Sequence, residues 1–236
     1  MTKSPPATVR DAWTSYISPD DYDAHMAGNG QAEANARLVA SLLARCPPRG
    51  NRLLIAGAGT GQWLDYGIDA LTGHHITCTD INPEFLTKLK ARAACAGHAL
   101  ETIVDDLEES QLSPAFDAAI IVLVLEHIDW RRGVASLARL GVERCFVITQ
   151  ENPPGQERLM TSREPIGTIR AFLTVHPTLV DPAALEAAFR DHGYGCAERE
   201  SVEVPDGKRM AGAVFRRSRR ERDYHQAAGG RGGVRS

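Results

Sequence analysis

Short apolar runs alternate along the chain with segments whose apolar residues recur at helical spacing. The runs are typical of buried parallel strands, and they lie at 52–56, 76–79, 102–104, 116–124 and 145–149. Helices are predicted at 31–45 and 62–71, from Asn82-Pro83 and Asp181-Pro182 onward, and after Asp129. This alternation predicts an α/β fold with a doubly wound, mostly parallel seven-stranded sheet that helices cover on both faces.

The two ends of the chain and one internal stretch depart from the alternation. Residues 1–30 show no sustained period and are predicted to form an irregular N-terminal arm or lid, whereas 31–217 form one compact domain. A loop is expected from about 150 to 179, before a last helix that Gly193 can end. Strand-like stretches flank the turn at 205–207, which predicts a C-terminal antiparallel hairpin. The Arg-rich and Gly-rich segment 218–236 is predicted to be a disordered tail.

Composition and charge narrow the class of protein. The chain of 236 residues is 43% hydrophobic and 24% charged, as in ordinary globular proteins. Its longest apolar run, 118–125, is far shorter than the roughly 20 residues that cross a bilayer, so we expect a cytoplasmic protein without a membrane partner. Five scattered cysteines without a C-x-x-C pair argue against a disulfide framework or a metal site. The net charge of −3 combines +5 from residues 216–236 with −8 from the rest, so a nucleic-acid partner is not expected on the folded domain.

Three features that follow successive predicted strands point to a nucleotide-like ligand. The run 53–56 leads into Gly57, Gly59 and Gly61, and closely spaced glycines let a backbone turn and approach a ligand. Asp80 ends the second strand, where a carboxylate can accept hydrogen bonds from ribose hydroxyls, although it could instead serve as a local helix cap. Asp105-Asp106 ends the third strand. The carboxyl ends of parallel strands meet at one edge, so these groups are predicted to share a crevice.

At these positions the chain resembles the class I S-adenosylmethionine-dependent methyltransferases, over about residues 30–217. In that family the glycine loop passes under the methionine part of the cofactor, the acid matching Asp80 binds the ribose, and the acid matching Asp106 meets the adenine amino group. The segment 116–128, which ends in Leu-Glu-His, is similar to the family's fourth strand. The resemblance implies a Rossmann-like methyltransferase fold, S-adenosyl-L-methionine as cofactor, and a cofactor site made of Tyr22, Gly57, Ala58, Gly59, Gly61, Asp80, Ile81, Asp106, Leu107 and Leu123.

Catalytic residues are less sharply indicated, because methyl transfer mainly requires alignment and sometimes a general base. His127 has the right titration range for that base, and the alternative is that it fixes its loop or packs against the cofactor. Tyr22 and Met26 can close over the cofactor or simply form the buried side of a short helix. Further candidates lie on the segments expected over the same edge: Trp13, Tyr16, His25, Gln31, Glu126, Arg163, Arg170 and His176.

One position departs from the family pattern. Many members have Asp or Glu where this chain has Ile55, and that acid helps to organise the amino end of the cofactor. Beyond a nearly minimal core, only the arm and the loop near 150–180 are available to build a substrate pocket, so we expect an enzyme that methylates an O or N atom of a small metabolite, with a homodimer left open as its assembly. Two alternatives remain: an RNA methyltransferase that grips its substrate with the basic tail, and an inactive cofactor-binding partner protein.

Overall fold

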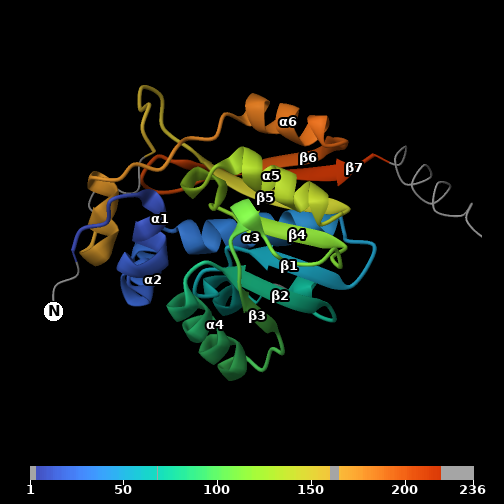
Figure 1. Cartoon of the computed structure of the whole chain (residues 1–236), viewed down its shortest axis with the longest axis horizontal. Helices are drawn as coiled ribbons and strands as arrows, with labels where there is room; N and C mark the ends of the chain where they lie inside the picture. The colour runs from blue at the N-terminus through green and yellow to red at the C-terminus, as the bar shows by residue number, and fades with distance from the viewer. Residues whose placement is uncertain (1–3, 68, 160–164, 219–236) are drawn as a thin grey trace, which may run out of the picture.

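A seven-stranded sheet forms the centre of the protein, as a computed structural model that describes residues 4–67, 69–159 and 165–218 shows (Figure 1). The strands lie in the order β3-β2-β1-β4-β5-β7-β6. Those from β1 to β5 pair in parallel, whereas β7 pairs antiparallel with both of its neighbours. Their bounds are Arg52–Ala56 (β1), His75–Asp80 (β2), Glu101–Val104 (β3), Ala118–Val122 (β4), Arg144–Glu151 (β5), Tyr194–Glu203 (β6) and Arg209–Arg217 (β7). The predicted fold class, including the C-terminal antiparallel hairpin, is confirmed.

Two apolar layers hold helices against the two faces of this sheet. Leu53 and Ile55 of β1 point into one layer with α3 (Gln31–Arg45) and Leu89 of α4 (Pro83–Cys95). Leu54 and Ala56 point into the other, with α5 (Trp130–Arg139) and α6 (Pro182–Asp191). Successive residues of a strand face opposite sides, so a run that is apolar at every position can bury both faces.

Local sequence signals set the ends of the helices where they were expected. The side chain of Asn82 accepts a hydrogen bond from the Glu84 backbone N–H at the start of α4, and Asp129 and Asp181 cap α5 and α6 in the same way. Gly193, at a φ of +81°, follows the end of α6. These caps satisfy N–H groups that a helix start leaves without a partner, which is why they can be recognised from sequence.

The prediction of one helix at 62–71 is wrong. The chain forms two short 3₁₀ helices there, η2 (Gln62–Tyr66) and η3 (Asp69–Leu71). Gly61 and Gly67 both adopt left-handed conformations at the ends of η2, with φ of +75° and +55°. A residue in that conformation cannot continue a right-handed helix, so the segment is divided.

The N-terminal segment is also more regular than predicted. It forms α1 (Val9–Asp11), a π-helical turn η1 (Ala12–Tyr16) and α2 (Pro19–Gly28). The predicted loop 150–179 contains a 3₁₀ helix, η6 (Gly167–Leu173). Ala12 and Ile17 share a separate apolar cluster with Ile169 and Phe172, so this arm and η6 pack on each other. Figure 1 shows both segments together on the same side of the sheet.

The division of the chain into an arm (1–30), a domain (31–217) and a tail (218–236) stays a prediction, and residues 219–236 of that tail lie outside the described residues. No helix in the described ranges is long and apolar enough to span a membrane.

Candidate active site

The loop after β1 is built from glycines because larger residues would collide with its surroundings. Gly57 and Gly59 have φ of +65° and +59°. A Cβ added to Gly57 would lie 2.3 Å from Val124 Cγ2, and one added to Gly59 would lie 3.3 Å from the ring of Tyr22. The backbone angle therefore favours glycine at both positions, and the close contact with Val124 adds a second constraint at Gly57.

Gly61 and Ala58 have different roles from these two. A Cβ on Gly61 would lie 2.9 Å from Leu89 Cγ, so Gly61 allows the loop to pack on α4. The N–H of Ala58 donates to the Thr79 carbonyl oxygen at 2.8 Å, which joins the loop to β2. Ala58 and Gly61 thus fix the position of the loop through its contacts with β2 and α4.

Asp80 ties the end of β2 to the glycine loop. Its Oδ2 accepts a hydrogen bond from the Gly59 N–H and its Oδ1 one from the Asn82 N–H, both at 2.9 Å. Burial raises the pKa of this carboxyl to about 6, and backbone N–H donors hold it below the value that burial alone would give. A carboxylate oxygen has two lone pairs, so Asp80 can still accept hydrogen bonds from a pair of hydroxyl groups.

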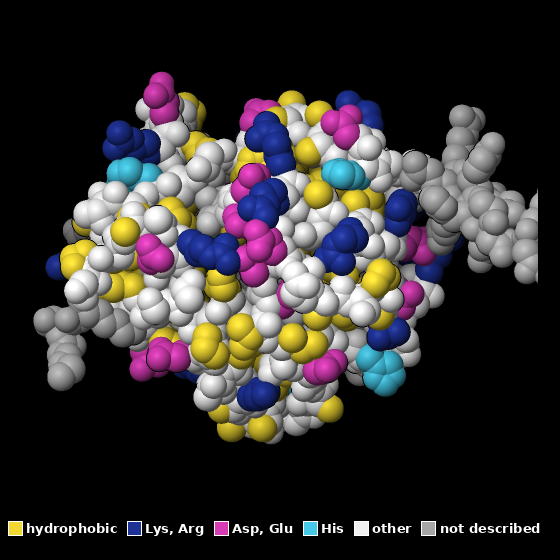
Figure 2. Space-filling model, in the orientation of Figure 1, with side chains coloured by type: hydrophobic (Ala, Val, Ile, Leu, Met, Phe, Trp, Pro, Cys, Tyr) yellow, Lys and Arg dark blue, Asp and Glu magenta, His cyan; other side chains and the backbone are white. Residues whose placement is uncertain are grey.

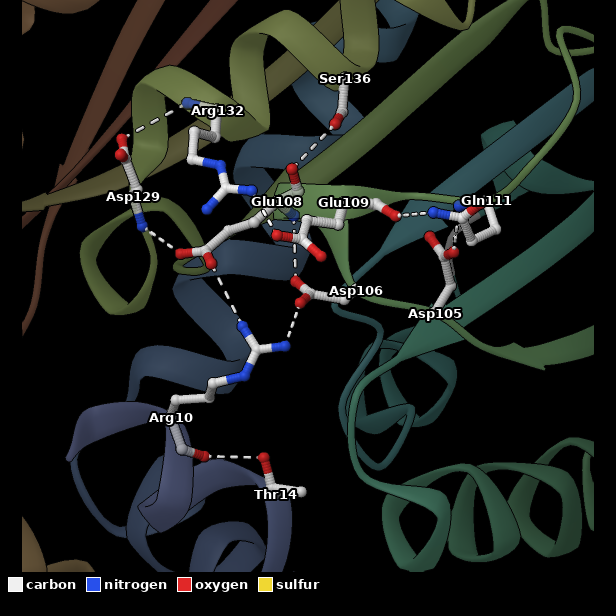
Figure 3. Close-up of polar contacts among 10 residues, drawn as sticks. All are labelled: Arg10, Thr14, Asp105, Asp106, Glu108, Glu109, Gln111, Asp129, Arg132 and Ser136. Atoms are coloured by element: carbon white, nitrogen blue, oxygen red, sulfur yellow. Dashed lines mark hydrogen bonds and ion pairs between the residues drawn. The ribbon is translucent and has the colours of Figure 1, made fainter. Parts of the chain in front are cut away.

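The acids after β3 are held in a network that reaches the N-terminal arm (Figure 3). Asp106 caps the 3₁₀ helix η4 (Leu107–Glu109) by accepting from the Glu108 N–H at 3.0 Å. Arg10 of α1 forms ion pairs with Asp106 and with Glu108, the latter at 3.2 Å. On the molecular surface, basic and acidic side chains gather side by side between α1 and α5 (Figure 2). Ion pairs of Arg10 thus connect the arm to the acids that follow β3.

A first cavity lies at the carboxyl edge of the sheet, between the glycine loop and the acids. Leu123, which lines it, has a φ of +54°, a left-handed conformation that ends β4 earlier than the predicted 116–124 run. Its walls include eight of the ten predicted cofactor residues, which are Tyr22, Gly57, Gly59, Asp80, Ile81, Asp106, Leu107 and Leu123.

A second cavity lies on the other side of Leu123 and extends under the arm. It shares Trp13, Tyr22 and His127 with the first cavity. His127 belongs to the 3₁₀ helix η5 (Leu125–His127), and its ring centroid lies 4.9 Å from that of Trp13. Burial among these rings lowers the pKa of His127 to about 3, so the imidazole is neutral near pH 7. His127 is thus placed at the site, in an environment that makes it a weak base.

Glu126 lies beside His127 in this cavity and is only 2% exposed. Its Oε1 accepts a hydrogen bond from the Gln150 N–H at 2.6 Å, whereas its Oε2 is buried without a partner. Burial raises the pKa of the carboxyl to about 7. Of the two neighbours, Glu126 is therefore the group whose protonation changes near neutral pH.

A third cavity lies between the glycine loop and α3. Ile55 lines it, as do Ala58 and Trp63. Asn35 of α3 also lines it and is 6% exposed, and both polar atoms of its amide lack a partner. Buried amides are normally hydrogen-bonded, so an unpaired amide on a residue that lines a cavity makes Asn35 a candidate contact for a polar ligand group.

The remaining candidates divide between the site and the surface. His25, Met26 and Gln31 line the second cavity, and Gln31 donates to Gln150 at 3.3 Å. Tyr16 packs against the apolar cluster of the arm instead. Arg170 and His176 are exposed, and Arg163 lies outside the described residues. Arg10 and Asn35 were missed, because neither belongs to a motif.

Residues 54–143 match a family profile described as Methyltransferase domain. This segment runs from β1 through the glycine loop, the acidic ends of β2 and β3, and α5. No curated protein has a significantly similar sequence. The match therefore covers the part of the chain that supplies most of the first cavity.

Several solved structures share the fold over most of the chain. Magnesium protoporphyrin IX methyltransferase from Synechocystis PCC 6803, with bound S-adenosylmethionine, has 20% identity and a TM-score of 0.57, over 80% of each chain. Geranyl diphosphate C-methyltransferase from Streptomyces coelicolor has 13% identity and a TM-score of 0.58, over 77% of this chain and 79% of that one. The cyclase SpnF has 16% identity and a TM-score of 0.58, over 77% and 80%. At these identities the likeness establishes the fold.

Proposed function

Because the chain carries the methyltransferase domain in the fold of the class I S-adenosylmethionine-dependent methyltransferases, we propose that it transfers a methyl group from S-adenosylmethionine to a small-molecule acceptor. The family, the enzyme class and the cofactor are those expected from the sequence. The domain match bears out a methyltransferase, and similar structures that contain S-adenosylmethionine or S-adenosylhomocysteine support the cofactor. The roles of individual residues in binding the cofactor and the acceptor are part of this proposal.

The strongest support for this function is the way three strand ends meet in the first cavity. The glycine loop, Asp80 and Asp106 come from three different strand ends, and they meet in the first cavity. In an open α/β sheet such a crevice is where a nucleoside binds, since backbone N–H groups and carboxylates there face polar hydroxyl and amino groups. The residues present fit an adenosine.

In the proposed complex, Asp80 accepts hydrogen bonds from the ribose hydroxyls, and Ile81 and Leu107 line the nucleoside. Asp106 is assigned to the adenine amino group, and its carboxylate is now paired with Arg10. Cofactor entry thus exchanges one partner of Asp106 for another, which requires Arg10 to move away.

The third cavity is assigned to the amino acid end of the cofactor. Ile55 is 5% exposed and part of the apolar core, so it offers that end no hydrogen bond. The unpaired Asn35 amide lines the same cavity and has both a donor and an acceptor. We therefore assign to Asn35 the positioning role that an acid at position 55 has in many family members.

The cofactor supplies an activated methyl group on a positively charged sulfur, and the protein must align the acceptor with it and exclude water. Trp13 and Tyr22 lie 5.7 Å apart, centroid to centroid, at the boundary of the first and second cavities. Aromatic faces there favour a sulfonium by cation–π attraction and keep water from the methyl group. His127, neutral and packed against Trp13, completes this wall.

Calorimetric titration with S-adenosylmethionine and S-adenosylhomocysteine tests the proposal directly. We expect saturable binding that Asp80→Ala weakens at least about tenfold, or 1.4 kcal/mol. The matched control is Asp191→Ala, which removes an exposed carboxylate at the end of α6 and should leave binding unchanged. A folded wild-type protein that binds neither ligand would refute the proposal.

We also propose an oxygen or nitrogen atom as methyl acceptor, a cytoplasmic location and a homodimer.

One alternative has specific support: the cyclase SpnF has the same fold, so the fold also occurs in proteins named for other chemistry. A cofactor-binding protein without methyl transfer would bind S-adenosylhomocysteine and release no methylated product with any acceptor. The RNA alternative rests on the tail, and truncation after residue 218 would abolish activity only in that case.

A further inference from the structure

Three residues that line the second cavity have polar atoms that the folded chain leaves without a partner. Trp13 Nε1, Glu126 Oε2 and His127 Nδ1 all belong to its lining residues, and each is buried without a hydrogen-bond partner. A buried polar atom without a partner costs about 1–3 kcal/mol, and native proteins contain few of them. Three around one cavity indicate that a bound molecule supplies the partners.

The charge of the cavity restricts what that molecule can be. None of the described residues that line it is Lys or Arg. His25 and His127 are held neutral, because burial lowers their pKa values to about 4 and about 3. Lys208 lies close enough to His25 to affect it, but its ammonium pairs with Asp206 at 2.9 Å. An anionic acceptor would thus meet the carboxyl of Glu126 without a counter-charge on these walls.

The residues that line the second cavity also restrict the shape of the molecule that can bind there. The ring centroids of Trp13 and Phe172 lie 5.4 Å apart, and that of His127 lies 5.5 Å from Phe172. Ile169 and Leu159 extend the same apolar lining. Aromatic and aliphatic walls with few polar groups favour a flat, apolar ligand whose orientation is set by one or two hydrogen bonds.

We propose that the second cavity binds an uncharged, flat acceptor that carries a hydroxyl or N–H group, and that Glu126 Oε2 is the base that removes its proton. This inference rests on the proposed function and deepens it, because it names the acceptor class and moves the base from His127 to its neighbour. The hydroxyl or N–H satisfies the unpaired oxygen of Glu126, and the ring system fills the aromatic lining.

The step balances without a further reactant. The acceptor oxygen or nitrogen forms a bond to the methyl carbon as the sulfur–methyl bond breaks, and the electron pair of that bond stays on sulfur. The positively charged sulfur becomes a neutral thioether, and the acceptor proton passes to Glu126 Oε2. The raised pKa of Glu126, about 7, suits a base that must be ionised before the reaction and hold a proton after it.

The groups that face Glu126 leave it as the residue that titrates near neutral pH. Tyr22 and His25 reach the cavity from α2, and His127 reaches it from η5. Burial holds the pKa of Tyr22 well above its usual range and that of both histidines well below pH 7. Asp80, with a pKa of about 6, lies in the first cavity instead.

Naphthol and hydroxynaphthoate form a matched pair of probes, since they differ by one carboxylate. We expect naphthol to bind the protein–S-adenosylhomocysteine complex saturably, and hydroxynaphthoate to bind at least tenfold more weakly. Equal or tighter binding of hydroxynaphthoate, or no binding of naphthol, would overturn the acceptor class. Because S-adenosylhomocysteine is titrated first in the same cell, loss of that binding reports failure of the proposed function instead.

The role of Glu126 is tested by the rate of naphthol methylation as a function of pH. The wild-type rate should rise with pH with a midpoint near 7, and Glu126→Gln should lower the plateau about a hundredfold and remove this rise. Glu126→Asp retains a carboxylate and should restore part of the rate, which distinguishes a base from a structural role. His127→Asn should keep the midpoint. A rise that survives in Glu126→Gln and disappears in His127→Asn would return the base to His127.

Discussion

The first and second cavities share a wall of aromatic side chains, but they differ in whether the carboxylates that line them have hydrogen-bond partners. In the first cavity Asp80 has backbone donors on both oxygens, and Asp106 has Arg10 and a backbone N–H. In the second cavity Glu126 has one oxygen satisfied and one unpaired, and Trp13 and His127 add further unpaired atoms. Trp13 and His127 line both cavities, so the unpaired oxygen of Glu126 is the feature that distinguishes the second cavity from the first.

This difference has an energetic consequence for binding. A ligand that enters the first cavity adds hydrogen bonds to an Asp80 that already has donors, and it replaces the exposed ion pair of Asp106, so each polar contact gains little net free energy. A ligand that enters the second cavity supplies partners to atoms that had none, which recovers about 1–3 kcal/mol per atom. Under the proposed function the first cavity is the cofactor end, where recognition depends on exchanging the partner of Asp106, and the second is the acceptor end, where it depends on satisfying buried groups.

The largest expected effect comes from closing the first cavity. Gly57→Ala should destabilise the protein by about 2–5 kcal/mol, because a left-handed Ala is strained and its Cβ would lie 2.3 Å from Val124 Cγ2. Gly73→Ala is the matched control, since Gly73 has a φ of +82° and no atom within 4 Å of an added Cβ, so it should lose only about 1–2 kcal/mol. Urea unfolding measures both, and equal losses would contradict the contact argument.

The unsatisfied carboxyl of the second cavity should reveal itself in the pH dependence of stability. The folded pKa of Glu126, about 7, exceeds its ordinary value of 4.5, so its contribution to stability is present below pH 4.5 and is lost as pH rises through 7. Glu126→Gln removes that loss. We expect the variant to be roughly 1–3 kcal/mol more stable than wild type at pH 8 and equally stable near pH 4.5.

Thermal or urea unfolding across this pH range tests the prediction, with Glu157→Gln as the control for removing an exposed carboxylate. A wild-type protein whose Glu126 contribution does not change between pH 5 and 8 would mean that the carboxyl is not buried in solution.

The third cavity allows a test in which stability and affinity change in opposite directions. Asn35→Leu removes two unpaired polar atoms from the interior and should leave stability unchanged or raise it by about 1 kcal/mol. The same change should weaken S-adenosylhomocysteine binding roughly fivefold, or about 1 kcal/mol. Adenosine, which lacks the amino acid end, should bind both proteins equally in calorimetry. A loss of adenosine affinity would show that Asn35 acts through the fold instead.

The smallest effect is expected at the ion pair between the arm and Asp106. The Arg10 side chain is 53% exposed, so its pair with Asp106 contributes about 0.2–1 kcal/mol. Arg10→Gln should therefore tighten cofactor binding by up to about fivefold, because Asp106 no longer has to exchange its partner. Arg37→Gln breaks an exposed ion pair on α3 and should change nothing. Weaker binding in Arg10→Gln would mean that Arg10 contacts the cofactor itself.

The grouping of residues in the first cavity could be predicted from sequence because its determinants are local. Gly57, Gly59 and Asp80 each follow an apolar run within a few residues, and the order of parallel strands brings their ends to one edge. Asn82 and Asp129 likewise act on backbone groups two or three residues away. The helix predicted at 62–71 is wrong because Gly67 adopts a left-handed conformation that interrupts it. The spacing of apolar residues in the sequence does not indicate that conformation.

The acceptor end depends on contacts between distant segments, and sequence patterns do not contain these. Glu126 becomes a strong candidate only when the arm and η6 cover it, because burial and the absence of a partner on Oε2 come from that packing. Asn35 is an ordinary helix residue until its cavity is seen. Arg10 pairs with an acid 96 positions away, and nothing nearby in the sequence marks it.

Tyr22 lines all three cavities, so its side chain connects the spaces that the ligands are proposed to fill. A side chain that belongs to three walls cannot move for one ligand without reshaping the space for the others. We expect compulsory-order kinetics, in which S-adenosylmethionine binds before the acceptor and S-adenosylhomocysteine leaves last. Initial-rate plots should then intersect, with S-adenosylhomocysteine competing with the methyl donor and not with the acceptor. The position of Tyr22 would then couple the binding of the methyl donor to that of the acceptor.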